Sequence, residues 1–154
     1  MEAGNLHLFE SGACLLHLAE AIKTSMQRDK RGPADARRWV IAAFDAIGMV
    51  SDPPWFLGMS GARGNRLFDW LDGRLAALER VLGEWVWLAA ARFTAADIAM
   101  ADVLRIPNLR ATGDRPATEA YVARATGRPG FEKAHADRNA PSVKADAVRR
   151  QSGR

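Results

Sequence analysis

Residues 93–104 read Phe-Thr-Ala-Ala-Asp-Ile-Ala-Met-Ala-Asp-Val-Leu, and this segment carries a complete signal for the start of a helix. Thr94 is the predicted N-cap residue. Asp97 follows three positions later, where its carboxylate reaches back to the backbone N–H of Thr94. Phe93 and Ile98 flank the cap at the two positions whose side chains pack together in a hydrophobic staple. We therefore predict that Thr94 and Asp97 form a structural capping box at the start of a helix.

The predicted helix is apolar almost all the way round, which is typical of a helix inside a core, so we expect it to be the central helix. Asp97 and Asp102 are five positions apart. At about 100° per residue they lie about 140° apart on the helix, so we do not expect an acid/base pair. Asp102 has three open interpretations: a buried carboxylate with a partner, an exposed carboxylate at the edge, or a residue that lines a pocket.

Composition limits the class of protein. The chain has 154 residues, of which 48% are hydrophobic, and this is enough for one core. No apolar run is long enough to span a bilayer and the first residues lack the features of a signal peptide, so we expect a cytoplasmic protein with no membrane partner. The net charge of +4 is spread over the chain without an aromatic stacking ladder, so no nucleic-acid partner is expected.

The remaining segments also predict a mainly α fold. Weak alternation at 5–9 indicates a short strand, and Ser11 is the expected N-cap of a helix with an apolar face. That face carries Leu15, Leu18, Ala19 and Ile22. Further helices are expected from about Asp35, after Gly64 with a leucine stripe, over 117–125, and from Pro129.

Cysteine and histidine chemistry is not indicated. Cys14 is the single cysteine, which excludes an internal disulfide, and its place in an apolar helix favours a small packing residue over a nucleophile. His7, His17 and His135 lack metal-ligand spacing, so no metal site is expected. The tryptophans are interpreted as core and edge packing.

Two separated segments resemble the same family. Residues 8–20, Leu-Phe-Glu-Ser-Gly-Ala-Cys-Leu-Leu-His-Leu-Ala-Glu, resemble the strand-to-helix segment that closes the thioredoxin-like domain of a glutathione S-transferase. The segment 93–102 resembles the capping box and staple of the buried helix in that family's C-terminal domain. Residues 121–131 resemble its closing helices, in the bacterial type.

The resemblance implies a mainly α fold, a glutathione S-transferase C-terminal-like helical bundle with a short strand–helix remnant of the thioredoxin-like domain. Residues 1–26 are the expected remnant, 33–139 the all-helical C-terminal domain, and 140–154 a disordered basic tail. The chain thus resembles an N-terminally truncated member of the family, and we expect in-frame coding sequence before Met1.

The resemblance also implies that Glu10 and Ser11 hold the γ-glutamyl end of glutathione, the cosubstrate; no other cofactor is expected. A hydroxyl and free amides at a helix N-terminus suit a ligand carboxylate, and Glu10 can accept from the ligand ammonium. The family's thiol-activating residue belongs to a region absent from this chain, so no catalytic residue is assigned. Trp39 and Phe44 are the candidates for a hydrophobic acceptor site.

The function implied is the conjugation of glutathione to hydrophobic electrophiles by the full-length parent, a cytoplasmic detoxification enzyme and homodimer. Two alternatives stay open. The chain is a non-catalytic, transferase-like helical module for dimerisation or protein binding, or it is a fragment that folds only marginally.

Overall fold

The computed structural model describes residues 1–154 except 4, 23–31, 50–65, 90–91, 107–112 and 141–154. The described part is mainly helical, as predicted. Its helices are α1 (Ser11–Ala21), α2 (Gly32–Ile41), the π-helix η1 (Ala42–Gly48), α4 (Arg66–Glu84), α5 (Ala95–Leu104), α7 (Pro116–Thr126) and α8 (Pro129–Asn139). Apart from Ala140, the predicted disordered tail lies outside the described residues.

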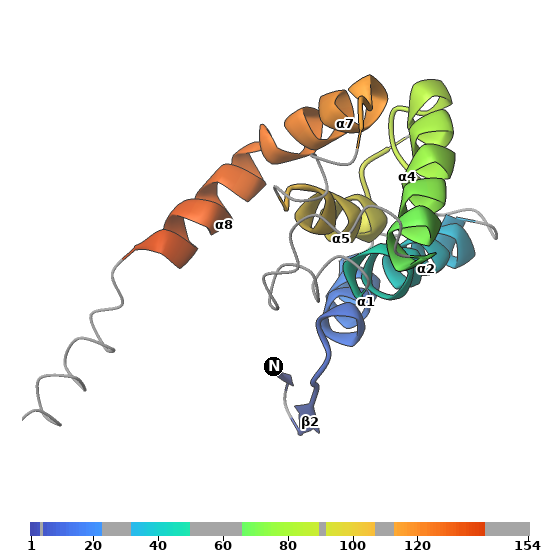
Figure 1. The fold of residues 1–154 in the computed structure, drawn as a ribbon. Coiled ribbons are helices and arrows are strands. Elements are labelled where there is room, and N and C mark those ends of the chain that lie inside the picture. Colours follow the sequence, from blue (N-terminus) through green and yellow to red (C-terminus); the bar gives the residue numbers. More distant parts are fainter. Residues whose placement is uncertain (4, 23–31, 50–65, 90–91, 107–112, 141–154) are drawn as a thin grey trace, which may run out of the picture.

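Helix α5 is the centre of the bundle (Figure 1), where it contacts α1, α2, η1 and α7. Eight of its ten residues are buried. Many of these are alanines, whose small side chains allow neighbouring helices to approach closely. The prediction of a central core helix over 93–104 is confirmed. Helix α5 ends at Leu104, with Arg105 as its C-cap.

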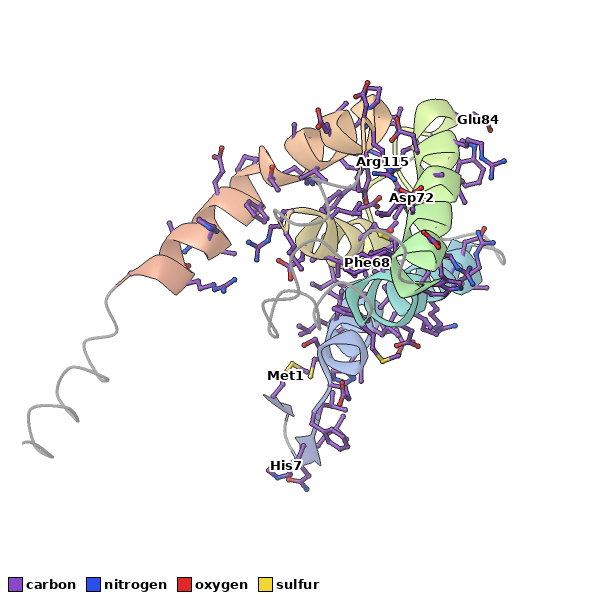
Figure 2. All side chains as sticks on the ribbon, viewed as in Figure 1. Met1, His7, Phe68, Asp72, Glu84 and Arg115 are labelled. Atoms are coloured by element: carbon purple, nitrogen blue, oxygen red, sulfur yellow. The ribbon has the colours of Figure 1, made fainter. Side chains whose placement is uncertain are left out.

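Helix α4 packs against α7 on the other side of the bundle (Figure 1). The predicted leucine stripe is buried at Leu71, Leu75, Leu78 and Leu82. An ion pair between Arg115 and Asp72 links the start of α7 to α4, and Figure 2 shows the two side chains together. Leucines at helical spacing therefore decide which face of α4 meets the core.

Glu79 on α4 caps the first turn of α7. Its carboxylate accepts hydrogen bonds from the backbone N–H groups of Ala117 and Thr118, both at 2.8 Å, and from the Thr118 hydroxyl at 2.6 Å. Burial raises the pKa of Glu79, but these hydrogen bonds and the charge of Arg115 outweigh burial and hold the pKa below its ordinary value. A carboxylate about forty residues away in sequence thus satisfies the free amides of α7.

Helix α2 starts earlier than predicted and continues into a π-helix. The expected start at about Asp35 is wrong by a few residues, because Pro33 fits the first turn of a helix that begins at Gly32. The chain then widens into η1 without a break. Val40, Ala43 and Ile47 are buried.

The N-terminal segment forms a small antiparallel hairpin with α1 after it. Strand β1 (Glu2–Ala3) pairs with β2 (Leu6–His7), so the strand expected over 5–9 is shorter than predicted and has a partner that the sequence did not indicate. Helix α1 contacts α2 and α5. Of its predicted apolar face, Leu18 is 46% exposed, and just beyond the helix Ile22 is 53% exposed. The face is therefore only partly covered.

Within the described residues, no helix has the length and apolar character needed to cross a membrane.

Candidate functional site

The start of α1 presents the two predicted site residues side by side. The prediction that Ser11 is the N-cap is wrong: the helix begins at Ser11, and Glu10 is the N-cap. Glu10 has φ 69° and ψ 121°, a backbone conformation that non-glycine residues rarely adopt, and its side chain makes no capping hydrogen bond. Such conformations cost free energy and occur preferentially at functional sites.

This helix start is open to a ligand. The backbone N–H of Cys14 donates to the carbonyl of the N-cap residue Glu10 at 3.0 Å, so the amides before Cys14 lack intrahelical acceptors. Both Glu10 and Ser11 are exposed. The Ser11 hydroxyl and the free amides can receive a carboxylate, while the Glu10 carboxylate can accept from an ammonium group.

A cleft of about 630 Å³ adjoins this helix start, and Ser11 is part of its wall. The cleft lies between α1, η1, α5 and the α7–α8 corner, and its volume is typical of small-molecule sites. Most of its lining is apolar: Leu15, Phe44, Phe93, Ile98, Ala99, Ala101, Ala125, Pro129, Phe131 and Ala134. Of the two acceptor candidates, Phe44 lines the cleft with Ser11, whereas Trp39 does not line it.

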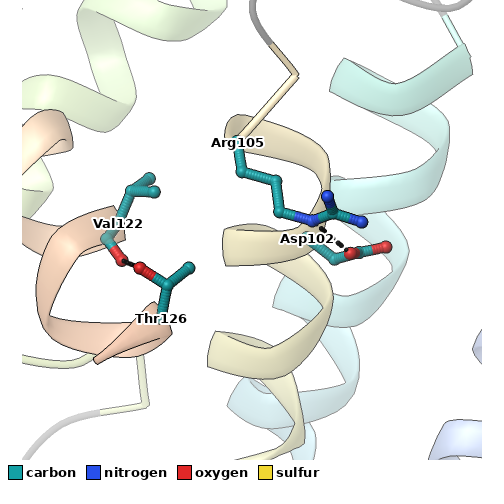
Figure 3. Close-up of polar contacts among 4 residues, drawn as sticks. All are labelled: Asp102, Arg105, Val122 and Thr126. Carbon is teal, nitrogen blue, oxygen red and sulfur yellow. Dashed lines mark hydrogen bonds and ion pairs between the residues drawn. The ribbon is translucent and has the colours of Figure 1, made fainter. Parts of the chain in front are cut away.

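Charged side chains line the same cleft. Arg105 donates to Asp102 at 2.7 Å on α5 (Figure 3). Asp102 is exposed and lines the cleft. It is therefore both an exposed carboxylate and a pocket residue, two of the three interpretations left open by the sequence. The Arg128 guanidinium lies over the Phe93 ring, 4.0 Å from its centroid, and Arg138 also contributes to the wall.

Asp97 is fully buried and its oxygens serve the fold. Both halves of the predicted capping box with Thr94 are present, and the Thr94 N–H donates to Asp97 Oδ2 at 2.8 Å. The other oxygen, Oδ1, accepts from the Leu88 N–H and from the Tyr121 hydroxyl, both at 3.0 Å. Burial raises the pKa of Asp97, and these hydrogen bonds partly oppose that rise.

Tyr121 is a structural partner and does not activate a thiol. Its ring is fully buried, and its hydroxyl is directed at Asp97. Burial and the neighbouring Asp97 carboxylate both raise the pKa of Tyr121, which keeps the hydroxyl protonated and donating. The local sequence motif revealed the cap but gave no sign of Leu88 or Tyr121, because both contacts depend on the packing of distant segments.

The remaining candidates have simpler surroundings. Cys14 is half-buried. His135 stacks on Phe131, with centroids 5.8 Å apart, and lines the cleft. Trp87 packs edge-on against Phe93 and Tyr121, whereas Trp55 lies outside the described residues. No group of metal-ligating side chains suited to an ion occurs among the described residues.

Sequence comparisons with protein-family models and with curated proteins found no match. Solved structures do match. A glutathione transferase from Burkholderia graminis, with two glutathione molecules bound per subunit, has 24% identity and a TM-score of 0.74 over 90% of this chain and 62% of its own. A glutathione transferase family member from Pseudomonas fluorescens, also with two glutathione bound, has 25% identity and a TM-score of 0.73 over 83% of this chain and 63% of its own.

A theta class glutathione S-transferase from Xanthomonas axonopodis, solved with glutathione bound, has 20% identity and a TM-score of 0.71 over 86% of this chain and 75% of its own. The chain therefore has a glutathione transferase-like fold. It spans 62–63% of the length of the first two of these structures.

Proposed function

We propose that the chain is part of a glutathione transferase-type protein, in which Glu10 and Ser11 hold glutathione and the adjoining cleft receives a hydrophobic electrophile. One observation carries the proposal: the uncapped N-terminus of α1 is exposed and opens on a cleft that includes Ser11. The fold supports it, because similar structures were solved with glutathione bound.

The two ends of the γ-glutamyl group match the two residues. Its α-carboxylate is received by the Ser11 hydroxyl and the free amides of the first turn, where the helix dipole favours a negative charge. Its α-ammonium is received by Glu10, in a charge-assisted hydrogen bond. The exposed Glu10 side chain is free to turn toward such a ligand because it does not cap the helix.

The proposed reaction is substitution at an electrophilic carbon. The glutathione sulfur forms a C–S bond to that carbon, the leaving group departs with its electron pair, and the thiol proton passes to solvent. Asp97 and Tyr121 are not positioned as a base for the thiol, since they are hydrogen-bonded to each other inside the core. We assign turnover to the full-length protein, in a thioredoxin-like domain of which residues 1–26 form the end.

Assembly and location are part of the same proposal. We expect a cytoplasmic, homodimeric detoxification enzyme in which residues 33–139 form the helical domain.

An alternative function, a non-catalytic module for dimerisation or protein binding, is favoured by the exposed apolar side chains Leu18 and Ile22 on and beside α1. Sedimentation velocity together with a glutathione titration separates the two: a stable oligomer that does not bind glutathione supports the module.

The direct test is isothermal titration of the chain with glutathione. We expect one saturable event that Ser11→Ala and Glu10→Gln each weaken by about tenfold, the effect of losing one charge-assisted hydrogen bond. Glu132→Gln is the matched control, because Glu132 is also an exposed acid at a helix start but does not line the cleft. Unchanged binding in both site variants, or equal loss in the control, would contradict the proposal.

A further inference from the structure

A second surface lies beside the cleft, where the segment after α4 meets α7. Trp87 is half-buried in this segment, and two guanidinium groups lie over its ring. The guanidinium of Arg124 is 5.2 Å from the ring centroid, and that of Arg128 is 5.9 Å from it. Among the described residues no other ring has two guanidinium groups over it, since Trp39 and Trp70 each have one. Two cations therefore converge on one exposed edge of α7.

These two arginines have no acidic partner. Within the described residues, neither Arg124 nor Arg128 forms an ion pair with a carboxylate. Arg38 differs from them, because it also lies over a tryptophan ring but pairs with Asp35 at 3.2 Å. Both Arg124 and Arg128 are exposed, so their charges face solvent. The surface around Trp87 consequently has a positive potential that this part of the chain does not neutralise.

Stacking holds the two cations in an orientation that suits a carboxylate. It uses the planar face of each guanidinium and leaves the N–H groups at the edge, which can donate two parallel hydrogen bonds. Arg128 is held on a second side by Phe93, whose ring centroid is 4.0 Å away. Side chains that are already held lose less conformational freedom when a partner binds. The pair is therefore prepared for an anionic partner.

Exposed apolar side chains lie next to the cations. Trp85 and Val86 directly precede Trp87, and they are 42% and 55% exposed. Consecutive Cα atoms are about 3.8 Å apart, so both residues lie at the edge of the same surface. Tryptophan and arginine are the residue types that dominate binding energy at protein interfaces. We call Trp85, Val86, Trp87, Arg124 and Arg128 the Trp87 patch.

We propose that the Trp87 patch docks an acidic segment of another protein, which is a function separate from the proposed glutathione site. Carboxylates of the segment pair with Arg124 and Arg128, and an apolar side chain between them packs on Trp85 and Val86. Charge complementarity selects this occupant. The chain's own last residues do not suit the patch, because residues 141–154 carry four basic side chains and one acidic side chain.

Two unlabelled peptides test the charge. The first is acetyl-Glu-Leu-Glu-Leu-Glu-amide, and the second has glutamine in place of each glutamate. In isothermal titration of the chain, the acidic peptide is expected to bind at one site, at least tenfold more tightly than the glutamine peptide. Added salt should weaken only the acidic peptide. Saturating glutathione should not displace it, because Trp87 and Arg124 do not line the cleft.

Three variants and a control locate the site. Arg124→Gln should weaken the acidic peptide about tenfold. Arg124→Lys keeps the charge but loses the planar fork, so its affinity should lie between those of the wild type and Arg124→Gln. It also repeats the test if Arg124→Gln fails to fold. Val86→Ser should weaken both peptides about threefold. Arg74→Gln is the matched control, because Arg74 lies over Trp70 at 4.7 Å without a second arginine and should leave binding unchanged.

Several results would overturn the inference. Equal affinity for the two peptides, or equal loss in Arg124→Gln and Arg74→Gln, would show that the patch does not select an acidic segment. Displacement of the peptide by glutathione would place the peptide in the glutathione site. Tighter binding of a ten-nucleotide oligothymidylate would make the patch a nucleic-acid site. An oligomer that Arg124→Gln dissociates in sedimentation velocity would show that a second copy of the chain covers the patch.

Discussion

The molecule contains two helix starts that differ in almost every respect. At the start of α5, Thr94 and Asp97 are buried and each carboxylate oxygen of Asp97 accepts from a backbone N–H. At the start of α1, Glu10 and Ser11 are exposed, and the N-cap side chain makes no capping bond. A closed cap stabilises a fold, whereas an open one leaves amides for a ligand. The two sites should therefore respond to mutation in opposite ways.

The largest effect is expected at the closed cap. Asp97→Ala removes the carboxylate that accepts hydrogen bonds from the N–H groups of Leu88 and Thr94 and from the Tyr121 hydroxyl. These donors are then left unpaired inside the core, so the free energy of unfolding should fall by more than about 3 kcal/mol. Thr94→Ala keeps the Thr94 N–H bond and should cost about 1 kcal/mol. Urea unfolding of both variants checks this difference. Equal costs would mean that Asp97 acts only as a local cap.

Tyr121→Phe should have the next largest effect. It deletes the hydroxyl that donates to Asp97 at 3.0 Å but keeps the buried ring, so we expect a loss of about 1.5–2 kcal/mol. In a double-mutant cycle with Asp97→Ala, the two losses should not add, because they remove the same hydrogen bond. Additive losses in urea unfolding would show that the two groups are not coupled.

Glu79→Gln should lower the free energy of unfolding by less, about 1 kcal/mol. It should also change how stability depends on pH. Gln keeps one acceptor oxygen where Glu79 offers two to Ala117 and Thr118. Because the pKa of Glu79 is held below its ordinary value of 4.5, its contribution is present above pH 4.5 and is lost as the pH falls through the folded pKa. Melting temperatures from pH 6 to 3 should therefore fall less steeply in the variant.

The smallest change in stability is expected at the open helix start, where the substitution should stabilise the protein instead of destabilising it. Glu10→Gly should raise the free energy of unfolding by up to about 1 kcal/mol, because glycine adopts a φ of 69° without strain. The same variant should lose affinity for glutathione in the titration described above. A destabilised variant with unchanged glutathione affinity would show that Glu10 serves the fold in the same way as Asp97.

Sequence patterns were most informative where the interaction is local. The capping box depends on residues three apart, and the leucine stripe of α4 depends on helical spacing, so both could be read from the chain. Contacts across long separations could not be predicted. Examples are Glu79 capping α7 and Tyr121 bonding to Asp97. The N-cap shift from Ser11 to Glu10 was missed because a glutamate with positive φ contradicts ordinary preferences.

The candidate site divides in the same way. The family resemblance predicted Glu10 and Ser11, which are adjacent in the chain, as glutathione-binding residues, and it suggested Phe44 for the acceptor site. The sequence did not reveal the cleft, because the walls of the cleft come from residues more than a hundred positions apart, such as Ser11 and Phe131. Arg128 and Arg138 have no distinctive local motif. Their common placement on the cleft follows only from the corner between α7 and α8.

The π-helix η1 has a consequence for how this site tolerates insertions and deletions. Each i to i+5 hydrogen bond of a π-helix encloses one more residue than the i to i+4 bond of an α-helix, and η1 lies directly after α2. Its wide turn contains Phe44, whose ring comes within 3.4 Å of the position of a Cβ built on Gly12 of α1. Deleting the exposed Asp45 would let this stretch return to α geometry. Because the wide turn already holds the extra residue, its deletion would keep the downstream residues, including buried Ile47, near their present face. The π-helix therefore makes this wall of the cleft tolerant of a one-residue deletion.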